Sequence, residues 1–158
     1  MTGVQTCALP ISAETSISAE EMRTALYQVF QTLGARNKVI AIPPDFTRFH
    51  SRAGALTSMT YEYYQDKLVD IMPALGTHVP MPAWQLDKMF VGVPHELFRE
   101  HRWRDDVLTI GQVPAEFVSQ VTAGIWEKPW PAQMNKLVFE GGHDLILSIG
   151  QVVPHEVI

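Results

Sequence analysis

One short stretch of the chain, residues 43–54, concentrates side chains that could do chemistry. It holds a carboxylate at Asp45, a hydroxyl at Thr47 and guanidinium groups at Arg48 and Arg52. Arginine is suited to gripping a carboxylate or a phosphate, because its planar head forms two parallel charge-assisted hydrogen bonds. The stretch therefore indicates a site for an anionic ligand. A plain loop salt bridge between Asp45 and Arg48 is the alternative interpretation.

The stretch follows an apolar, β-branched run that predicts a buried strand at 38–42. Further strands are predicted at 68–75, where Pro73 suggests an edge, and at 144–150, whose apolar run is typical of a buried strand. Helical patterns lie between these strands. Alternating strands and helices favour an α/β fold, an open and mostly parallel Rossmann-like sheet with helices on both faces.

The remaining elements are predicted from caps and spacing. Ser18 and Glu21 form a capping box and Gly34 supplies a stop, which together predict a helix over 18–34. The other predictions are helices at 57–67, 82–90 and 94–101, a strand at 106–111, and irregular structure over 122–133.

Chemically capable side chains follow three of the predicted strands. Asp45 and Arg48 follow the first strand, His78 follows the second, and His155 follows the last. In open parallel sheets, ligands bind beyond the carboxyl ends of the strands, so these side chains are expected to share one rim. Each histidine also has a structural interpretation: His78 as a loop residue bonded to backbone, and His155 as a packing residue.

Composition narrows the classes of protein. The chain has 158 residues, 46% hydrophobic and 18% charged, with a net charge of −5, which is typical of one soluble globular domain. No basic face favours nucleic acid, and no apolar run approaches the roughly 20 residues of a membrane helix. The six histidines lack zinc-ligand spacing, which argues against a metal hydrolase. A cytoplasmic location is expected.

The first twelve residues do not match the rest of the chain. They are uncharged, show no helix or strand period, and lack the parts of a secretory signal. They resemble an in-frame translation of a sequencing-library adapter, so we interpret 1–12 as a non-native leader and 13–158 as a truncated N-terminal α/β domain of a larger protein. The only cysteine, Cys7, lies in that leader, so no disulfide or cysteine-bound metal is expected in 13–158.

Three motifs resemble those of the nickel-dependent lactate racemase family. Asp45-Phe46-Thr47-Arg48 is similar to its Asp-x-Thr-Arg motif, and the segment 74–80 around His78 is similar to its Gly-x-His motif after a strand. Residues 135–155 contain the predicted strand 144–150 and end at His155, and they are similar to the family's third motif. The three occur in the family's order over roughly 38–156.

The resemblance implies a racemase or epimerase acting at C2 of a 2-hydroxy acid, with a nickel-pincer nucleotide that takes a hydride from C2 and returns it to the other face. It implies His78 and His155 as paired acid/bases and Arg48 as the substrate-binding residue. It implies Asp45 and Thr47 as cofactor-binding residues. Two histidines suit an inversion, because each enantiomer needs a base and histidine works as base and acid near neutral pH.

The chain also departs from the family. Many members have proline directly after the first motif, whereas Phe49 follows here, which suggests a larger and more polar substrate such as a sugar acid. The family's cofactor-tethering lysine and nickel-binding histidine lie further along than Ile158. No metal ligand is therefore assigned, the cofactor is expected for the full-length protein only, and this fragment alone is expected to be inactive.

Two functions from different classes remain open. One is the racemase, whose expected partner is a small-molecule 2-hydroxy acid, with neither nucleic acid nor membrane as a partner. The other is a non-catalytic α/β domain that binds an anionic metabolite at the loop from Asp45 to Arg48. A lysine and a histidine at the family positions downstream would favour the racemase.

Overall fold

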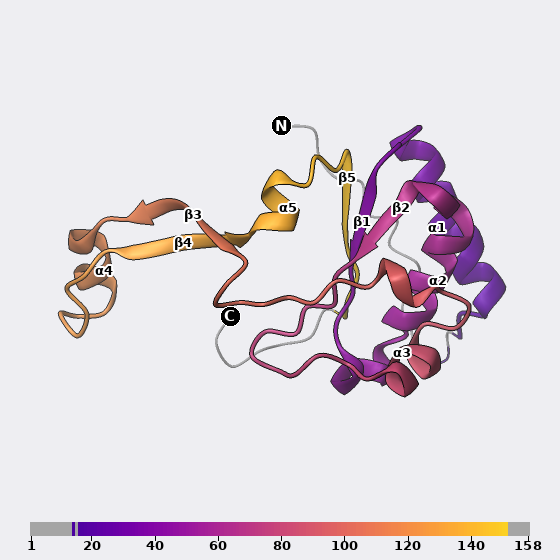
Figure 1. Ribbon diagram of the computed structural model, residues 1–158, viewed down its shortest axis with the longest axis horizontal. Coiled ribbons are helices and arrows are strands. Elements are labelled where there is room, and N and C mark those ends of the chain that lie inside the picture. Colours follow the sequence, from indigo (N-terminus) through magenta and orange to yellow (C-terminus); the bar gives the residue numbers. More distant parts are fainter. Residues whose placement is uncertain (1–13, 15, 152–158) are drawn as a thin grey trace. The chain divides into compact units, whose positions relative to one another are not determined.

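The computed structural model describes residue 14 and residues 16–151 (Figure 1). The expected leader, 1–12, and His155 lie outside the described residues. The chain divides into two units, Met1–Gly34 and Ala35–Ile158. Within the described residues, no helix is both long and apolar enough to cross a membrane.

The first unit contains helix α1 (Ala19–Leu33). Ser18 Oγ accepts the backbone N–H of Glu21 at 3.2 Å, and the Glu21 carboxylate accepts the backbone N–H of Ser18 at 2.8 Å. These reciprocal bonds satisfy two amides that the helix itself leaves without partners. The helix ends at Gly34, whose φ of 77° suits a glycine. The predicted capping box and helix are confirmed.

The second unit is built on a parallel sheet with strand order β2–β1–β5 (Figure 1). Its strands are β1 (Val39–Ile42), β2 (Leu68–Ile71) and β5 (Leu145–Ser148). The first three residues of β1 are fully buried, as expected for a β-branched strand with a neighbour on each side. The predicted α/β fold, and the parallel alignment of the three predicted strands, are confirmed.

The two outer strands differ from their predictions. Strand β2 ends at Ile71, so the prediction of a strand up to residue 75 is too long, although an isolated bridge from Pro44 to Ala74 extends its pairing with the chain after β1. Strand β5 forms where predicted, but it is not buried: Ile146 is 46% exposed. Within the described residues β5 pairs with β1 alone, which explains the exposure.

Three helical elements follow the strand ends. They are η1 (Phe46–Ser51), α2 (Ala53–Tyr64) and α3 (Ala83–Met89). Helix α2 begins four residues earlier than predicted and contacts β2. A Cβ atom at Gly54 would overlap the backbone carbonyl oxygen of Met89, so a glycine at this position permits the close approach of α2 and α3.

An antiparallel ribbon of β3 (Val107–Val113) and β4 (Trp130–Asn135) lies outside the parallel sheet (Figure 1). Helix α4 (Ala115–Val121) falls between these strands in the sequence. The prediction of a strand at 106–111 is confirmed, whereas irregular structure over 122–133 is wrong from Trp130 onward. Proline lacks a backbone donor and is disfavoured in strands. Because β4 contains Pro131, its sequence did not predict a strand.

The predicted helix at 94–101 is also wrong. Only a single turn forms, η3 (His95–Leu97). Phe98 then bridges Ile71, and the backbone N–H of Arg99 donates to the Ile71 carbonyl at 2.8 Å. This extended pairing along the outer side of β2 outweighs the helical preference. Two short helices complete the unit, η2 (Gln65–Lys67) and α5 (Lys136–Glu140).

Candidate functional site

The loops after β1 and β2 meet through Asp45 and His78. Nδ1 of His78 lies 2.5 Å from Oδ2 of Asp45. The contact follows from the fold, because β1 and β2 are parallel neighbours whose carboxyl ends lie at the same edge of the sheet. The backbone N–H of Ala74 also donates to the carbonyl of Pro43 at 2.7 Å, which keeps the two chain segments paired beyond the strands.

Thr47 holds the second oxygen of the same carboxylate. Asp45 Oδ1 accepts the Thr47 backbone N–H at 3.0 Å and the Thr47 hydroxyl at 2.5 Å. Asp45 is the residue that caps η1, so the sequence order aspartate, any residue, threonine builds this clamp locally. Only 9% of the Asp45 side chain is exposed. Its two oxygens face the Thr47 backbone N–H, the Thr47 hydroxyl and Nδ1 of His78.

The hydrogen bonds keep Asp45 ionised. Burial by itself would raise the pKa of this carboxyl, but the bonds from the Thr47 hydroxyl, from His78 and from the Thr47 backbone outweigh it. The pKa of Asp45 therefore lies below its ordinary value. An ionised carboxylate has no proton to donate, so at neutral pH the hydrogen between the two residues is carried by Nδ1 of His78.

His78 itself is open to its surroundings. Its side chain is 57% exposed, and its backbone N–H donates to the carbonyl of Leu75 at 2.9 Å. Nε2 of the ring bonds to none of the described residues. Because a neutral imidazole with its proton on Nδ1 has a lone pair on Nε2, the pair can offer a nitrogen base to a small molecule.

Arg48 is an exposed cation of the loop, as is Arg52, and neither pairs with any of the described residues. The salt bridge to Asp45 considered from the sequence does not form, since that carboxylate is taken by His78 and Thr47. The Arg48 side chain is exposed and has no hydrogen bond or ion pair with any described residue. Its guanidinium is therefore available to an anion.

An aromatic cluster anchors η1. Phe46 and Phe49 are three residues apart, which places them on one side of a 3₁₀ turn, with ring centroids 5.2 Å apart. Phe46 also meets the edge of Trp84 on α3 at 5.2 Å, and Lys88 Nζ lies 5.4–5.8 Å from the centroids of the two phenyl rings. These contacts hold η1, and with it the Asp45 loop, against α3.

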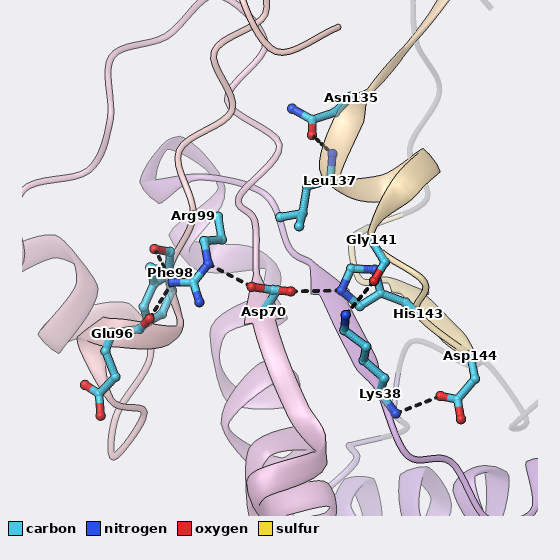
Figure 2. Close-up of polar contacts among 10 residues, drawn as sticks. All are labelled: Lys38, Asp70, Glu96, Phe98, Arg99, Asn135, Leu137, Gly141, His143 and Asp144. Carbon is cyan, nitrogen blue, oxygen red and sulfur yellow. Dashed lines mark hydrogen bonds and ion pairs between the residues drawn. The ribbon is translucent and has the colours of Figure 1, made fainter. Parts of the chain in front are cut away.

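A second aspartate–histidine pair lies elsewhere in the same unit and was not predicted from the sequence (Figure 2). Asp70 on β2 accepts from Nε2 of His143 at 2.8 Å and from Nε of Arg99 at 2.7 Å. The His143 side chain is fully buried and that of Asp70 is 10% exposed. Asp70 and His143 are 73 residues apart, and only the strand order β2–β1–β5 brings them together.

The surroundings of His143 give it a structural role. A Cβ atom on Gly141 would overlap the His143 ring, so the ring packs directly against that glycine. Nδ1 of His143 is buried and has no partner among the described residues. Arg99 also donates to the carbonyl of Glu96 at 2.5 Å, so the cluster ties β2 to the segment around Arg99 and to the turn before β5 (Figure 2). With no accessible nitrogen, His143 cannot serve a ligand.

A cleft of about 610 Å³ lies beside this buried cluster, lined by Arg99 and by parts of 100–106 and 135–141, and it does not include Asp45 or His78. Its cations are engaged: Arg102 binds Asp106 through two hydrogen bonds, and Lys136 Nζ donates to the Asp105 carbonyl. We therefore place the candidate site at the Asp45–His78 pair. No group of three or more potential metal ligands occurs among the described residues.

Comparison with known proteins supports the fold. No protein-family model and no curated protein matches the chain. A crystal structure of a protein from Thermotoga maritima, determined by the Northeast Structural Genomics Consortium, is similar with a TM-score of 0.77 and 28% sequence identity. The match covers 89% of this chain and 35% of that one, so it spans about a third of the Thermotoga protein. That protein is described by its source alone, and the similarity therefore supports a compact α/β fold without assigning an activity.

Proposed function

We propose that this chain belongs to a racemase or epimerase that acts at C2 of a 2-hydroxy acid, with His78 as one of its two acid/bases. The observation that carries the proposal is the pairing of an exposed His78 with the ionised, nearly buried Asp45. The motif resemblance at 45–48 and around His78 agrees with it. The runner-up is a non-catalytic domain that binds an anionic metabolite.

The chemistry of inversion explains why a base is needed. A hydride can leave C2 only as the C2 hydroxyl loses its proton, because the carbon then becomes a carbonyl. In this proposal Nε2 of His78 accepts that proton from one enantiomer, and the second base, His155 as the resemblance implies, donates a proton to the carbonyl oxygen when the hydride returns to the opposite face. In the reverse direction the two histidines exchange roles, so every conversion uses both.

Hydride transfer is the task of the nickel-pincer nucleotide that the resemblance implies. The described residues do not fit a metal by themselves, since they contain no group of three or more potential ligands. The chemistry proposed for this chain is therefore limited to proton transfer and to binding of the substrate.

Arg48 supplies the grip on the substrate carboxylate in this proposal. Its guanidinium has no partner among the described residues, so binding a carboxylate breaks no internal ion pair. A charge-assisted hydrogen bond of this kind contributes about 1.5–3 kcal/mol. Holding the carboxylate also orients C2 and its hydroxyl toward His78, which helps the reaction beyond simple affinity.

The decisive assay follows racemisation, in both directions, of a panel of 2-hydroxy acids and sugar acids by the full-length protein loaded with cofactor. His78→Ala and His155→Ala should each lower turnover by about 10²–10⁴-fold in both directions, the usual size of acid–base assistance. His95→Ala is the matched control, because His95 is also exposed and bonded to an aspartate, Asp87, at 2.8 Å. Near-normal turnover of His78→Ala on the best substrate would remove this histidine from the mechanism.

The binding-domain alternative is favoured by one observation, the exposed and unpaired Arg48. It predicts that the cofactor-loaded full-length protein binds 2-hydroxy acids without interconverting their enantiomers. Calorimetric titration with wild type and Arg48→Ala would then show loss of binding with no turnover in either protein. Turnover in the wild type rejects this alternative.

A further inference from the structure

We propose that Asp45 and Thr47 are positioning residues that act through His78 by fixing which of its ring nitrogens carries the proton. The catalytic value of this arrangement rests on the proposed function, whereas the state of the ring does not. The resemblance implies cofactor-binding roles for both residues, and the geometry assigns them a different task.

The assignment follows from the hydrogen bonds that each oxygen of the Asp45 carboxylate makes. Oδ1 of Asp45 accepts two hydrogen bonds from Thr47, at 3.0 and 2.5 Å, and Oδ2 faces Nδ1 of His78 at 2.5 Å. An ionised carboxylate can only accept hydrogen bonds. Nδ1 must therefore be the donor, and the lone pair of the neutral ring is left on Nε2, the nitrogen without a described partner.

The position of the proton decides whether His78 can act as a base. A neutral imidazole has two tautomers, and the hydrogen bond made by one nitrogen selects the state of the other. If Nε2 carried the proton, the exposed side of the ring would present a donor and could not take a proton from a hydroxyl. Asp45 thus does for His78 what a buried carboxylate does in a catalytic triad, where it fixes tautomer and orientation.

Thr47 makes this arrangement testable, because it determines how an asparagine would sit at position 45. An asparagine has the shape of aspartate, but only one of its two side-chain heads accepts hydrogen bonds. The two donors of Thr47 require the amide oxygen on their side, so the amide NH₂ turns toward His78. That NH₂ donates to Nδ1, and the ring proton moves to Nε2. Asp45→Asn should therefore invert the tautomer with almost no change in shape.

The experiment is long-range ¹H–¹⁵N NMR of the 158-residue chain labelled at histidine, recorded at a pH where the ring is neutral. Wild-type His78 is expected to carry its proton on Nδ1, and Asp45→Asn is expected to carry it on Nε2. The double variant Asp45→Asn/Thr47→Val, which loses one of the two donors that orient the amide, is expected to give a mixture. Asp87→Asn, the same change at the exposed pair with His95, should leave the His78 signal unchanged.

Two outcomes would overturn the inference: a wild-type His78 with its proton on Nε2, or a folded Asp45→Asn whose tautomer matches the wild type. The wild-type spectrum decides the first point even if the variant fails to fold. In the cofactor-loaded full-length enzyme, Asp45→Asn should lower kcat by about 10²–10⁴-fold with little change in KM. A wild type with the expected tautomer but no turnover would reject the proposed function and leave the positioning intact.

Discussion

Asp45 and His78 meet beyond the end of the sheet, where the histidine is 57% exposed, whereas Asp70 and His143 meet within the unit, where the histidine is fully buried. Both pairs join a carboxylate to an imidazole, through Nδ1 in His78 and through Nε2 in His143. The two pairs differ in the exposure of the other ring nitrogen. Nε2 of His78 has no partner among the described residues and belongs to an exposed ring, whereas Nδ1 of His143 is buried and its ring packs against Gly141. Burial, and not the pairing itself, separates a potential acid/base from a structural contact.

The second partner of each carboxylate also differs. Asp45 is held by neutral donors of Thr47, two residues along the chain, whereas Asp70 is held by the cation of Arg99, 29 residues away. A buried carboxylate is costly to leave without compensation, so the distant ion pair stabilises the fold around Asp70. The local clamp on Asp45 orients a side chain without fastening distant parts of the chain.

The largest difference is expected on removal of the carboxylates. Asp70→Ala leaves buried His143 without its hydrogen-bond partner and frees Arg99, which should lower the free energy of unfolding by about 3 kcal/mol. Asp45→Ala removes a helix cap and should cost about 1 kcal/mol, since water can solvate the exposed His78. Urea unfolding of the 158-residue chain, followed by circular dichroism, measures both. Equal losses would mean that the two pairs do not differ in structural role.

Removal of the histidines should show a smaller contrast in the same direction. His143→Ala leaves a cavity and an unsatisfied Asp70, and should lower the free energy of unfolding by about 2 kcal/mol. His78→Ala removes an exposed ring, which opens Asp45 Oδ2 to water while Thr47 still bonds Oδ1, so it should change the free energy of unfolding by less than about 0.5 kcal/mol. The same urea titrations apply, with His95→Ala as the exposed control. A destabilising His78→Ala would assign that residue to the fold instead of the site.

Chemical modification compares the two histidines within one molecule. Diethyl pyrocarbonate should modify His78 at least ~10-fold faster than His143, because the buried ring reacts only when the structure opens locally. Peptide mass spectrometry over a time course at pH 7 gives both rates, and His95, 45% exposed, supplies an internal reference. The contrast should vanish in urea. Similar rates in the native chain would contradict the burial of His143.

The smallest expected effect is on the pH dependence of stability. The pKa of Asp45 is lowered in the folded chain, so its contribution is present above the unfolded value of about 3.9 and is lost as pH falls through the lower folded value. Asp45→Asn should therefore flatten the decline in stability between about pH 5 and pH 2. Unfolding curves across this range test it, with Asp87→Asn as the control. An unchanged slope would show that Asp45 is not stabilised in its ionised form.

Features encoded by neighbouring residues could be predicted from the sequence. The cap formed by Ser18 and Glu21 uses residues three positions apart, and the apolar run of β1 marks its burial directly. The strand-end rule also placed Asp45 and His78 on one rim, which their contact confirms. The bond itself could not be predicted, because it depends on the pairing that continues past β1 and β2.

Features that depend on distant partners were missed. Strand β4 exists through its ladder with β3, and its own sequence, interrupted by Pro131, has no strand pattern. The segment after η3 is extended because it pairs with Ile71. The contact of Asp70 with His143 needs the strand order, which no local pattern reveals.

Gly54 sets a boundary for any redesign of the ligand preference of this loop. The space that a side chain would occupy there is filled by the carbonyl oxygen of Met89, on the same helix that carries Trp84. A library that varies His50, an exposed position of η1 outside the aromatic cluster, leaves this contact in place. A library that includes position 54 would instead displace α3, and with it the aromatic support of the loop, so most of its members would be lost to misfolding before any selection for substrate began.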